Sequence, residues 1–238
     1  MQKEYLIAGL RVQMDTFGRT LAQAQPYLCE TTGKVDMVIS SKPENLQEQN
    51  PHLSLDDCEY LSTGGSFYRQ LLGFQGMLIH ASAVVMDGYA YLFSAPCGTG
   101  KSTHTTMWRE AFGYDRSLIL NDDKPALRYE DSRWYAYGTP WSGKTDQNLN
   151  MKVPLGGVCV LTRGLTNEIH RFSGSTAVFE LLQQTARPNV ADSRERLLEL
   201  LDCLLKEVPV WKLSCTPTKE AALVAQEAMA GEAKKHFG

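Results

Sequence analysis

A glycine-rich segment followed by lysine and serine carries the strongest chemical signal in the sequence. Residues 95–102 are APCGTGKS, and the apolar segment 89–94 precedes them. Such a loop between a strand and a helix binds phosphate, because backbone N–H groups, the helix N-terminus and the lysine all favour an anion. The strict pattern G-x-x-x-x-G-K-[ST] has glycine where this chain has Ala95. We expect the alanine to be tolerated if its φ is negative.

The same segment predicts which residues hold a nucleotide. Lys101 is expected to reach the β and γ phosphates, and the Ser102 hydroxyl to ligate Mg²⁺ or Mn²⁺. Cys97 brings a thiol next to the N-terminus of the predicted helix. A glycine-rich turn with an incidental lysine is the alternative. The residues predicted to bind ATP or GTP are Cys97, Gly98, Thr99, Gly100, Lys101, Ser102 and Thr103.

Two adjacent carboxylates stand further along the chain. Asp122 and Asp123 follow the segment 117–121, so they lie at the end of a predicted strand, where α/β proteins gather their ligand sites. One aspartate can hold Mg²⁺ while the other accepts a proton from an attacking hydroxyl, and both tasks belong to phosphoryl transfer. An exposed turn that uses aspartate only for its geometry is the alternative.

A histidine precedes Lys101 by 21 residues. His80 lies in the predicted strand 77–86, which is joined to the strand 89–94 by the two-residue turn Asp87-Gly88. Pairing of these two strands places His80 beside the predicted phosphate site. By spacing alone, a lone strand histidine is more often a structural residue than a functional one.

Together these motifs resemble the superfamily shared by HPr kinase/phosphorylase and phosphoenolpyruvate carboxykinase. The matching segments, within residues 60–215, are IHASA at 79–83, GTGKS at 98–102, NDD at 121–123 and GTPWSGK at 138–144. The last segment is similar to one in HPr-kinase-like proteins, and some members of that wider group are associated with peptide-modification gene clusters. The resemblance implies an α/β fold with a P-loop kinase core, in which helices flank a mixed β-sheet.

The resemblance also implies roles for individual residues. His80 and Asp123 match positions that hold metal in the carboxykinases, and Asp122 matches the aspartate implicated as acid and base in HPr kinases. The chain departs from the usual pattern at Ala95 and at Cys97, where serine is common. Neither departure removes a group that contacts phosphate.

The segment 140–144, PWSGK, offers a further cation. We expect Lys144 to act in catalysis on a mobile basic lid over the transferring phosphate, with Trp141 packing against nucleotide or acceptor. A hairpin loop with a core tryptophan is the alternative. Arg163, after a buried strand, is a second candidate cation, whereas His104 is expected to be structural or exposed.

An α/β scaffold is needed to position these residues. The sequence pattern changes near residue 76, where a strand-turn-strand pattern begins. This change predicts a small α/β lead-in at 1–75 and a nucleotide-binding catalytic domain at 76–238. The elements expected in the lead-in are strands 5–14 and 35–40, helices 16–28 and 56–74, and an exposed loop at 42–51. Those expected in the second part include a helix that follows the loop, a hairpin at 126–138 and a buried strand at 154–164.

Composition excludes several classes of protein. With 24 basic and 27 acidic residues the net charge is −3, and no basic run provides an electrostatic footprint for nucleic acid. No apolar stretch approaches the length that spans a bilayer, so we expect no membrane anchor. The six cysteines form no C-x-x-C pair, which indicates reduced thiols in a cytoplasmic protein.

The favoured function is a Mg²⁺-dependent kinase that moves the γ-phosphoryl group of ATP or GTP to a hydroxyl group. The resemblance implies that serine or threonine of a peptide or small protein is the acceptor, and a homo-oligomer is possible. A carboxykinase-like or phosphorylase-like reaction on a small metabolite is one alternative, but only Arg69, Arg128 and Arg163 are candidates for gripping a dicarboxylate. A nucleotide-gated module without turnover is the other alternative.

Overall fold

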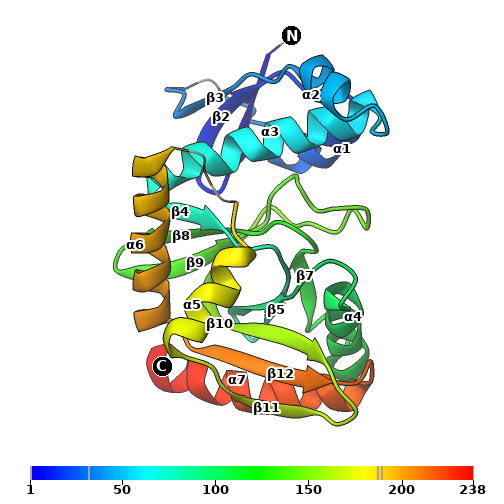
Figure 1. Cartoon of the computed structure of the whole chain (residues 1–238), viewed down its shortest axis with the longest axis vertical. Coiled ribbons are helices and arrows are strands. Elements are labelled where there is room, and N and C mark those ends of the chain that lie inside the picture. Colours follow the sequence, from blue (N-terminus) through cyan, green and yellow to red (C-terminus); the bar gives the residue numbers. More distant parts are fainter. Residues whose placement is uncertain (1, 32, 187, 189, 238) are drawn as a thin grey trace.

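Two β-sheets organise the chain (Figure 1). The computed structural model describes residues 2–31, 33–186, 188 and 190–237. A three-stranded sheet lies at the N-terminal end, and a nine-stranded mixed sheet forms the rest of the described scaffold, with helices on both of its faces. The chain is therefore a mixed α/β protein, as the sequence predicts.

The N-terminal sheet is a hairpin with a third strand added in parallel. Strands β1 (Lys3–Ile7) and β2 (Leu10–Met14) are antiparallel, and β3 (Met37–Ile39) pairs with β2. The prediction of one strand over 5–14 is wrong, because the chain turns at Ala8 and Gly9, whose φ angles are 51° and 75°. Alanine seldom adopts a positive φ, so the sequence gives little sign of this turn.

Three α-helices accompany this sheet. Helix α1 (Gly18–Ala24) continues into a 3₁₀ turn at Gln25–Tyr27, and α3 (Leu55–Leu71) into another at Leu72–Phe74. The segment predicted as an exposed loop instead contains α2 (Pro43–Gln49). Proline at the first helical position suits this helix, because its missing N–H has no acceptor there in any case.

The large sheet combines antiparallel and parallel strands. Its main path runs β4-β8-β9-β10-β6-β5-β7, β12 pairs with the other side of β10, and β11 pairs with β12. Strand β10 changes neighbours along its length, pairing first with β9 and then with β6 and β12. The strands are β4 (Gly76–Leu78), β5 (Ala81–Met86), β6 (Tyr89–Ser94), β7 (Leu118–Asn121), β8 (Ala126–Glu130), β9 (Arg133–Tyr137), β10 (Lys152–Arg163), β11 (Glu168–Arg171) and β12 (Val210–Cys215).

The expected hairpin around Asp87-Gly88 is confirmed, but its first strand is shorter than predicted. Asp87 and Gly88 both have positive φ, and Ala81 to Met86 pair in register with Ser94 to Tyr89. The continuous strand predicted over 77–86 is wrong, because Ile79 and His80 lie between two strands. The break occurs where the chain changes partners, since β4 pairs with β8 whereas β5 pairs with β6 and β7.

Helices cover both faces of the large sheet. Helices α4 (Lys101–Phe112) and α7 (Lys219–Phe237) pack on one face through an apolar cluster that includes Trp108. Helices α5 (Gly174–Gln183) and α6 (Ala191–Glu207) supply leucines to the cluster on the other face. A third cluster joins the N-terminal layer to Leu78, Tyr137 and Trp141 of the large sheet and its loops. Whether 1–75 and 76–238 are separate domains stays a prediction.

The direction of the strands explains where the chemical residues gather. Strands β6, β10 and β12 are parallel, and β7 points the same way because β5 lies antiparallel to both β6 and β7. Their carboxyl ends therefore share one edge of the sheet, together with the start of β5. In open α/β sheets this edge is where ligands bind.

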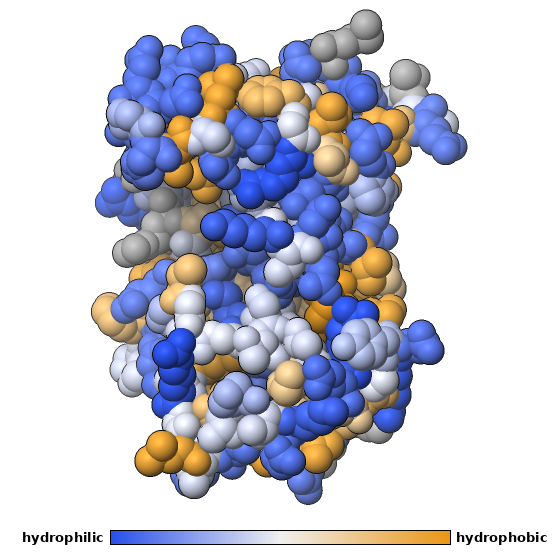
Figure 2. Space-filling model, turned by 90° about the vertical axis from the view of Figure 1, so that its right-hand side faces the viewer, coloured by the Kyte–Doolittle hydropathy of each residue, from blue (hydrophilic) through white to orange (hydrophobic). Residues whose placement is uncertain are grey.

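The outer surface on this side is mostly hydrophilic. Figure 2 shows the face that includes the α4 side of the molecule, where apolar residues form small scattered groups among polar ones. Among the described residues, no helix has both the length and the apolar character needed to cross a membrane.

Candidate functional site

The loop between β6 and α4 turns at two glycines. Gly98 and Gly100 have φ angles of 77° and 122°, values that other residues rarely adopt. A Cβ atom at either position would meet no other atom within 4 Å, so the space beside the loop is open. Ala95 does not have a positive φ, which confirms that alanine is tolerated at the first position of the motif. The loop has room for an anion on its glycine side.

Lys101 is the first residue of α4 and folds back over the loop. Its Nζ atom donates a hydrogen bond to the Ala95 carbonyl at 2.9 Å, and 8% of the residue is exposed. Burial lowers the pKa of the ammonium group from its ordinary value. The first amide groups of α4 have no acceptor within the helix, as at any helix N-terminus. The ammonium group and these amides together provide the donors that an anion requires.

Asp122 is buried and fixed by two hydroxyl groups. Its Oδ1 atom accepts a hydrogen bond from Ser82 Oγ at 2.5 Å, and its Oδ2 atom accepts one from Thr145 Oγ1 at 2.7 Å. The Ser82 hydroxyl also contacts Thr105 Oγ1 at 2.8 Å. Since Ser82 belongs to β5 and Thr105 to α4, this chain of hydroxyls connects the carboxylate with the helix that begins at the loop.

Asp123 lies between two cationic or potentially cationic groups. Its Oδ1 atom is 2.9 Å from His80 Nε2, and its Oδ2 atom forms an ion pair with Lys124 Nζ. Burial alone would raise the pKa of Asp123, but the His80 hydrogen bond and the Lys124 charge bring it down to about 2. Asp123 is therefore an anion at ordinary pH, which suits a ligand for a cation better than a base.

His80 reaches this site from the break between β4 and β5. Its N–H group donates to the Gln184 carbonyl at 2.7 Å, and its own carbonyl accepts a hydrogen bond from Ser94 Oγ at 2.9 Å. The prediction that His80 lies within a paired strand is therefore wrong, because β5 begins one residue later, at Ala81. The predicted pairing that brings His80 near the end of β6 is confirmed, because Ala81, the next residue, pairs with Ser94.

The N-terminal layer reaches the same site through Tyr60 of α3. The Tyr60 hydroxyl accepts a hydrogen bond from the Gly143 N–H at 2.8 Å, and the Lys124 ammonium lies 4.8 Å from the centre of the Tyr60 ring. A Cβ atom at Gly143 would come within 2.9 Å of Asp123 Cβ. Gln23 of α1 also donates to the Gly143 carbonyl at 3.2 Å. The loop at residue 143 therefore lies against Asp123 and is held there by α1 and α3.

Trp141 is a core residue and does not pack against a ligand. Its side chain is fully buried, stacks on Phe67 with ring centres 4.9 Å apart, and donates to Thr63 Oγ1 at 3.2 Å. The hypothesis that it contacts nucleotide or acceptor is wrong, because the side chain has no exposed surface and packs against Phe67, Tyr68 and Thr63 of α3. Lys144 is exposed, and its part in a lid stays a prediction.

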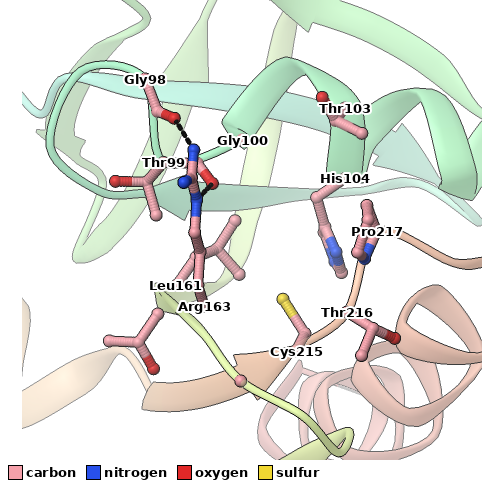
Figure 3. A pocket seen from close by; sticks show the side chains of 12 residues that line it. Gly98, Thr99, Gly100, Thr103, His104, Leu161, Arg163, Cys215, Thr216 and Pro217 are labelled. Carbon is pink, nitrogen blue, oxygen red and sulfur yellow. Dashed lines mark hydrogen bonds between the residues drawn. The ribbon is translucent and has the colours of Figure 1, made fainter.

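The remaining residues predicted from the loop motif surround its exposed side. Cys97, Ser102 and Thr103 are exposed, with Thr99 half-buried. Arg163 extends from the end of β10 and donates hydrogen bonds to the carbonyls of Gly98 at 2.6 Å and Thr99 at 3.3 Å (Figure 3). The arginine therefore braces the loop. His104 is buried and accepts a hydrogen bond from Trp108, so its predicted structural role is confirmed.

The donor set suits a cation that arrives with a nucleotide. No group of three or more His, Cys, Asp or Glu side chains gathers among the described residues. His80 and Asp123 converge, and the Ser102 side chain is exposed at the first turn of α4. Mg²⁺ commonly takes one or two carboxylates together with substrate phosphates and water. The residues present fit that mode rather than a complete protein cage.

Sequence reasoning missed four residues that shape the site. Lys124 follows the two aspartates directly, so its position was visible in the sequence although its ion pair was not. Ser82 stands within the IHASA segment at 79–83, but its contact with Asp122 was not predicted. Thr145 and Tyr60 come from distant elements and carry no recognisable local signal. Their contacts depend on the packing of β5, the 139–149 segment and α3 around the sheet edge.

Comparisons with known proteins place the chain in a family. The family model described as "SynChlorMet cassette protein ScmC" matches residues 62–219, about two thirds of the chain, and this range includes the glycine-rich loop, both aspartates and His80. No curated protein matches the sequence. Among solved structures, the chain is similar to the Hpr(Ser) kinase/phosphatase from Coxiella burnetii, with 12% identity and a TM-score of 0.39. The alignment covers 68% of this chain and 99% of the other.

Proposed function

The chain belongs to the SynChlorMet cassette protein ScmC family, and we propose that it is a Mg²⁺-dependent kinase. The proposed reaction transfers the γ-phosphoryl group of ATP or GTP to the hydroxyl group of serine or threonine in a peptide or small protein. The choice of acceptor rests on the motifs shared with HPr-kinase-like proteins and on the surroundings of Asp122.

The connection between Asp122 and α4 carries the proposal. Ser82 bridges the carboxylate to Thr105, one turn after the lysine of the glycine-rich loop. A phosphoryl group held at the loop would thus have a fixed, buried carboxylate as a neighbour. Transfer to a hydroxyl needs both elements, because catalysis of this reaction depends on positioning and on charge stabilisation.

Thr145 indicates how an acceptor would meet the carboxylate. Thr145 is an exposed residue whose hydroxyl donates to Asp122 Oδ2, while Oδ1 stays fixed by the buried Ser82 hydroxyl. A serine or threonine of an acceptor can replace the Thr145 hydroxyl and donate in the same way. The acceptor oxygen then attacks the γ-phosphorus, its proton passes to Asp122, and the bond to the nucleoside diphosphate breaks.

The remaining residues take roles that follow from their charges. Lys101 would leave the Ala95 carbonyl to bind the β and γ phosphates, and the amides of the loop would bind the same groups. Asp123, His80 and Ser102 would hold Mg²⁺, which when bound supplies positive charge to the phosphate oxygens. Lys144, exposed at the end of the 138–144 motif, would approach the transferring group from the solvent side.

The three arginines considered for a carboxykinase lie in different places. Arg128 pairs with Glu130 at 2.6 Å and donates to the Ala8 carbonyl, and Arg163 binds the loop carbonyls. Arg69 lines a polar groove on the N-terminal layer beside Lys42. The three side chains therefore do not form one binding site for a dicarboxylate, and a hydroxyl group is the better proposal for the acceptor.

Transfer of labelled phosphate tests the proposal directly. The protein is incubated with ATP labelled in the γ position, Mg²⁺ and a pool of peptides or lysate proteins, and the products are analysed by mass spectrometry. We expect phosphoserine or phosphothreonine. Lys101→Ala should abolish turnover and weaken nucleotide binding by about 1.5 to 3 kcal/mol, the usual contribution of a hydrogen bond to a charged group.

Two further variants make the result specific. Asp122→Asn should lower the rate of transfer by about 10²- to 10⁴-fold with nucleotide binding largely kept, because positioned proton transfer contributes about that much. Lys206→Ala, which removes an exposed lysine on α6, is the matched control and should behave as the wild type. Efficient formation of phosphoenolpyruvate from oxaloacetate, with no phosphorylated peptide from any pool, would refute the kinase.

A further inference from the structure

The segment from Gly143 to Gln147 is fastened beside Asp122 at both of its ends. At the first end, the Gly143 N–H group donates a hydrogen bond to the Tyr60 hydroxyl at 2.8 Å. At the second end, the Gln147 carbonyl accepts one from the Asp122 N–H group at 3.1 Å, and the Gln147 side chain accepts one from Arg109 of α4 at 3.1 Å. Three residues, 144–146, lie between these anchors, so their side chains have little freedom to move away from the carboxylate.

Thr145 lies in the middle of this segment and has the chemical group that the proposed reaction modifies. The chain turns around it, with positive φ angles of 72° at Gly143 and 55° at Asp146. The residue is exposed, and its hydroxyl donates to Asp122 Oδ2 at 2.7 Å. Ser82, which donates to Oδ1 of the same carboxylate, is fully buried and has no space beside it for a phosphoryl group. Of these two hydroxyls, only that of Thr145 is open to a phosphate.

We propose that Thr145 is itself phosphorylated by the site of its own chain when ATP is bound and no other acceptor is present. The inference rests on the proposed kinase function, and it adds a modification site. A hydroxyl that is already bonded to the proposed base needs no encounter between two molecules. Holding a reacting group in position in this way removes a large part of the barrier to a bimolecular reaction.

The step is a single phosphoryl transfer within the chain. The Thr145 Oγ1 atom forms a bond to the γ-phosphorus of ATP, and the bond from that phosphorus to the departing ADP oxygen breaks. The hydroxyl proton passes to Asp122 Oδ2, which accepts the hydrogen bond from Oγ1 in the structure. The products are ADP and phosphothreonine, whose phosphate carries a charge of about −1.5 to −2 at pH 7. Lys144, the exposed residue before Thr145, brings a positive charge next to this phosphate.

Thr166 is a matched internal control for this modification. It is also an exposed threonine, and its hydroxyl also donates to a carboxylate, that of Glu168, at 2.8 Å. It lies between β10 and β11 and has a different carboxylate as its partner. Because Thr166 shares the exposure and the type of contact but not the contact with Asp122, phosphorylation confined to Thr145 reports on the candidate site.

The experiment treats the wild-type protein with a phosphatase, removes the phosphatase, and adds γ-labelled ATP and Mg²⁺ without any peptide. Phosphorylated residues are mapped over time by peptide mass spectrometry. We expect phosphate at Thr145 and none at Thr166, with a first-order rate that stays the same over a tenfold range of protein concentration. Thr145→Val should remove this label, and Thr166→Val should be labelled as the wild type is. Asp122→Asn should slow the labelling of Thr145 by about 10²- to 10⁴-fold, the usual contribution of positioned proton transfer.

The outcomes distinguish a failure of this proposal from a failure of the kinase. If a peptide pool is phosphorylated under the same conditions while Thr145 stays unmodified, the kinase stands and the proposed modification is wrong. It is also wrong if the rate rises in proportion to protein concentration, because a second copy then supplies the phosphate, or if Thr166 is labelled as fast as Thr145. If neither Thr145 nor any peptide is phosphorylated, the proposed function fails as well. The mapping uses the wild-type protein, so it decides the matter even where a variant does not fold.

Discussion

Glu59 is a buried carboxyl group whose replacement should make the protein more stable at alkaline pH. It lies on α3, is fully buried, and accepts a hydrogen bond from the Thr20 hydroxyl of α1. Burial raises its pKa from 4.5 to about 7, with a smaller opposing effect from the Thr20 hydrogen bond. The neighbouring residue, Tyr60, contacts the loop at Gly143, so the packing of α1 on α3 also supports the candidate site.

The size of the effect follows from the two pKa values. Well below pH 4.5 the carboxyl group is protonated in both the folded and the unfolded chain. The free energy of unfolding then has its highest value as far as this group is concerned. Between pH 4.5 and about 7 only the unfolded chain ionises, so the free energy of unfolding falls by about 1.4 kcal/mol per pH unit. The contribution is lost once the pH exceeds the folded pKa, and the total loss is at most about 3 kcal/mol.

Urea denaturation at pH 5 and pH 8 measures this loss. Glu59→Gln keeps the shape of the side chain and removes the charge, so it should be close to the wild type at pH 5 and more stable by up to about 3 kcal/mol at pH 8. Glu48→Gln, at an exposed position on α2, is the control and should show no such dependence. If Glu59→Gln destabilises the protein equally at both pH values, the carboxylate is ionised and paired in the folded state, and the reasoning is wrong.

Three further predictions concern the site. Trp141→Ala should lower the free energy of unfolding by about 3 to 5 kcal/mol in chemical denaturation, whereas a tryptophan that contacted nucleotide would change ATP affinity with little effect on stability. Asp123→Asn and His80→Ala should both raise the Mg²⁺ concentration that gives half-maximal activity, and an unchanged requirement would remove them from the metal site. Lys124→Gln should lower that Mg²⁺ concentration about threefold or more, because the ammonium group competes with the cation for Asp123; a higher requirement would show that the lysine assists cation binding.

Local patterns predicted the parts of the site that depend on neighbouring residues. The Asp87-Gly88 turn sets the pairing of β5 with β6, and the two glycines of the loop have the positive φ angles that the motif requires. Such features were accessible because glycine, aspartate and the alternation of apolar residues act over a few positions. The position of Asp122 after β7 was accessible for the same reason.

Features of the structure that depend on contacts between distant residues could not be predicted from local sequence patterns. The break at His80 occurs because β4 and β5 pair with different strands, although the apolar pattern continues across it. Trp141 follows a strand as many loop residues do, but α3 folds over it and supplies the stacking partner Phe67. The two hydroxyls that fix Asp122 come from residues 40 positions before it and 23 after it. No local signal can identify such pairs.

The charges of the site are already balanced within the chain, and this limits what a ligand must supply. Asp123 pairs with Lys124, and Lys101 is held by the Ala95 carbonyl close enough to both aspartates for their charges to act on it. A nucleotide with Mg²⁺ would therefore exchange one set of partners for another, with Lys101 moving from a carbonyl to a phosphate and Asp123 from an ammonium group to a metal ion. In this exchange Lys101 and Asp123 each keep a partner of opposite charge or polarity at both stages, so neither charge is left unpaired. The loop after β6, the aspartates after β7 and the histidine before β5 can share these partners only because the strand directions bring all three to one edge.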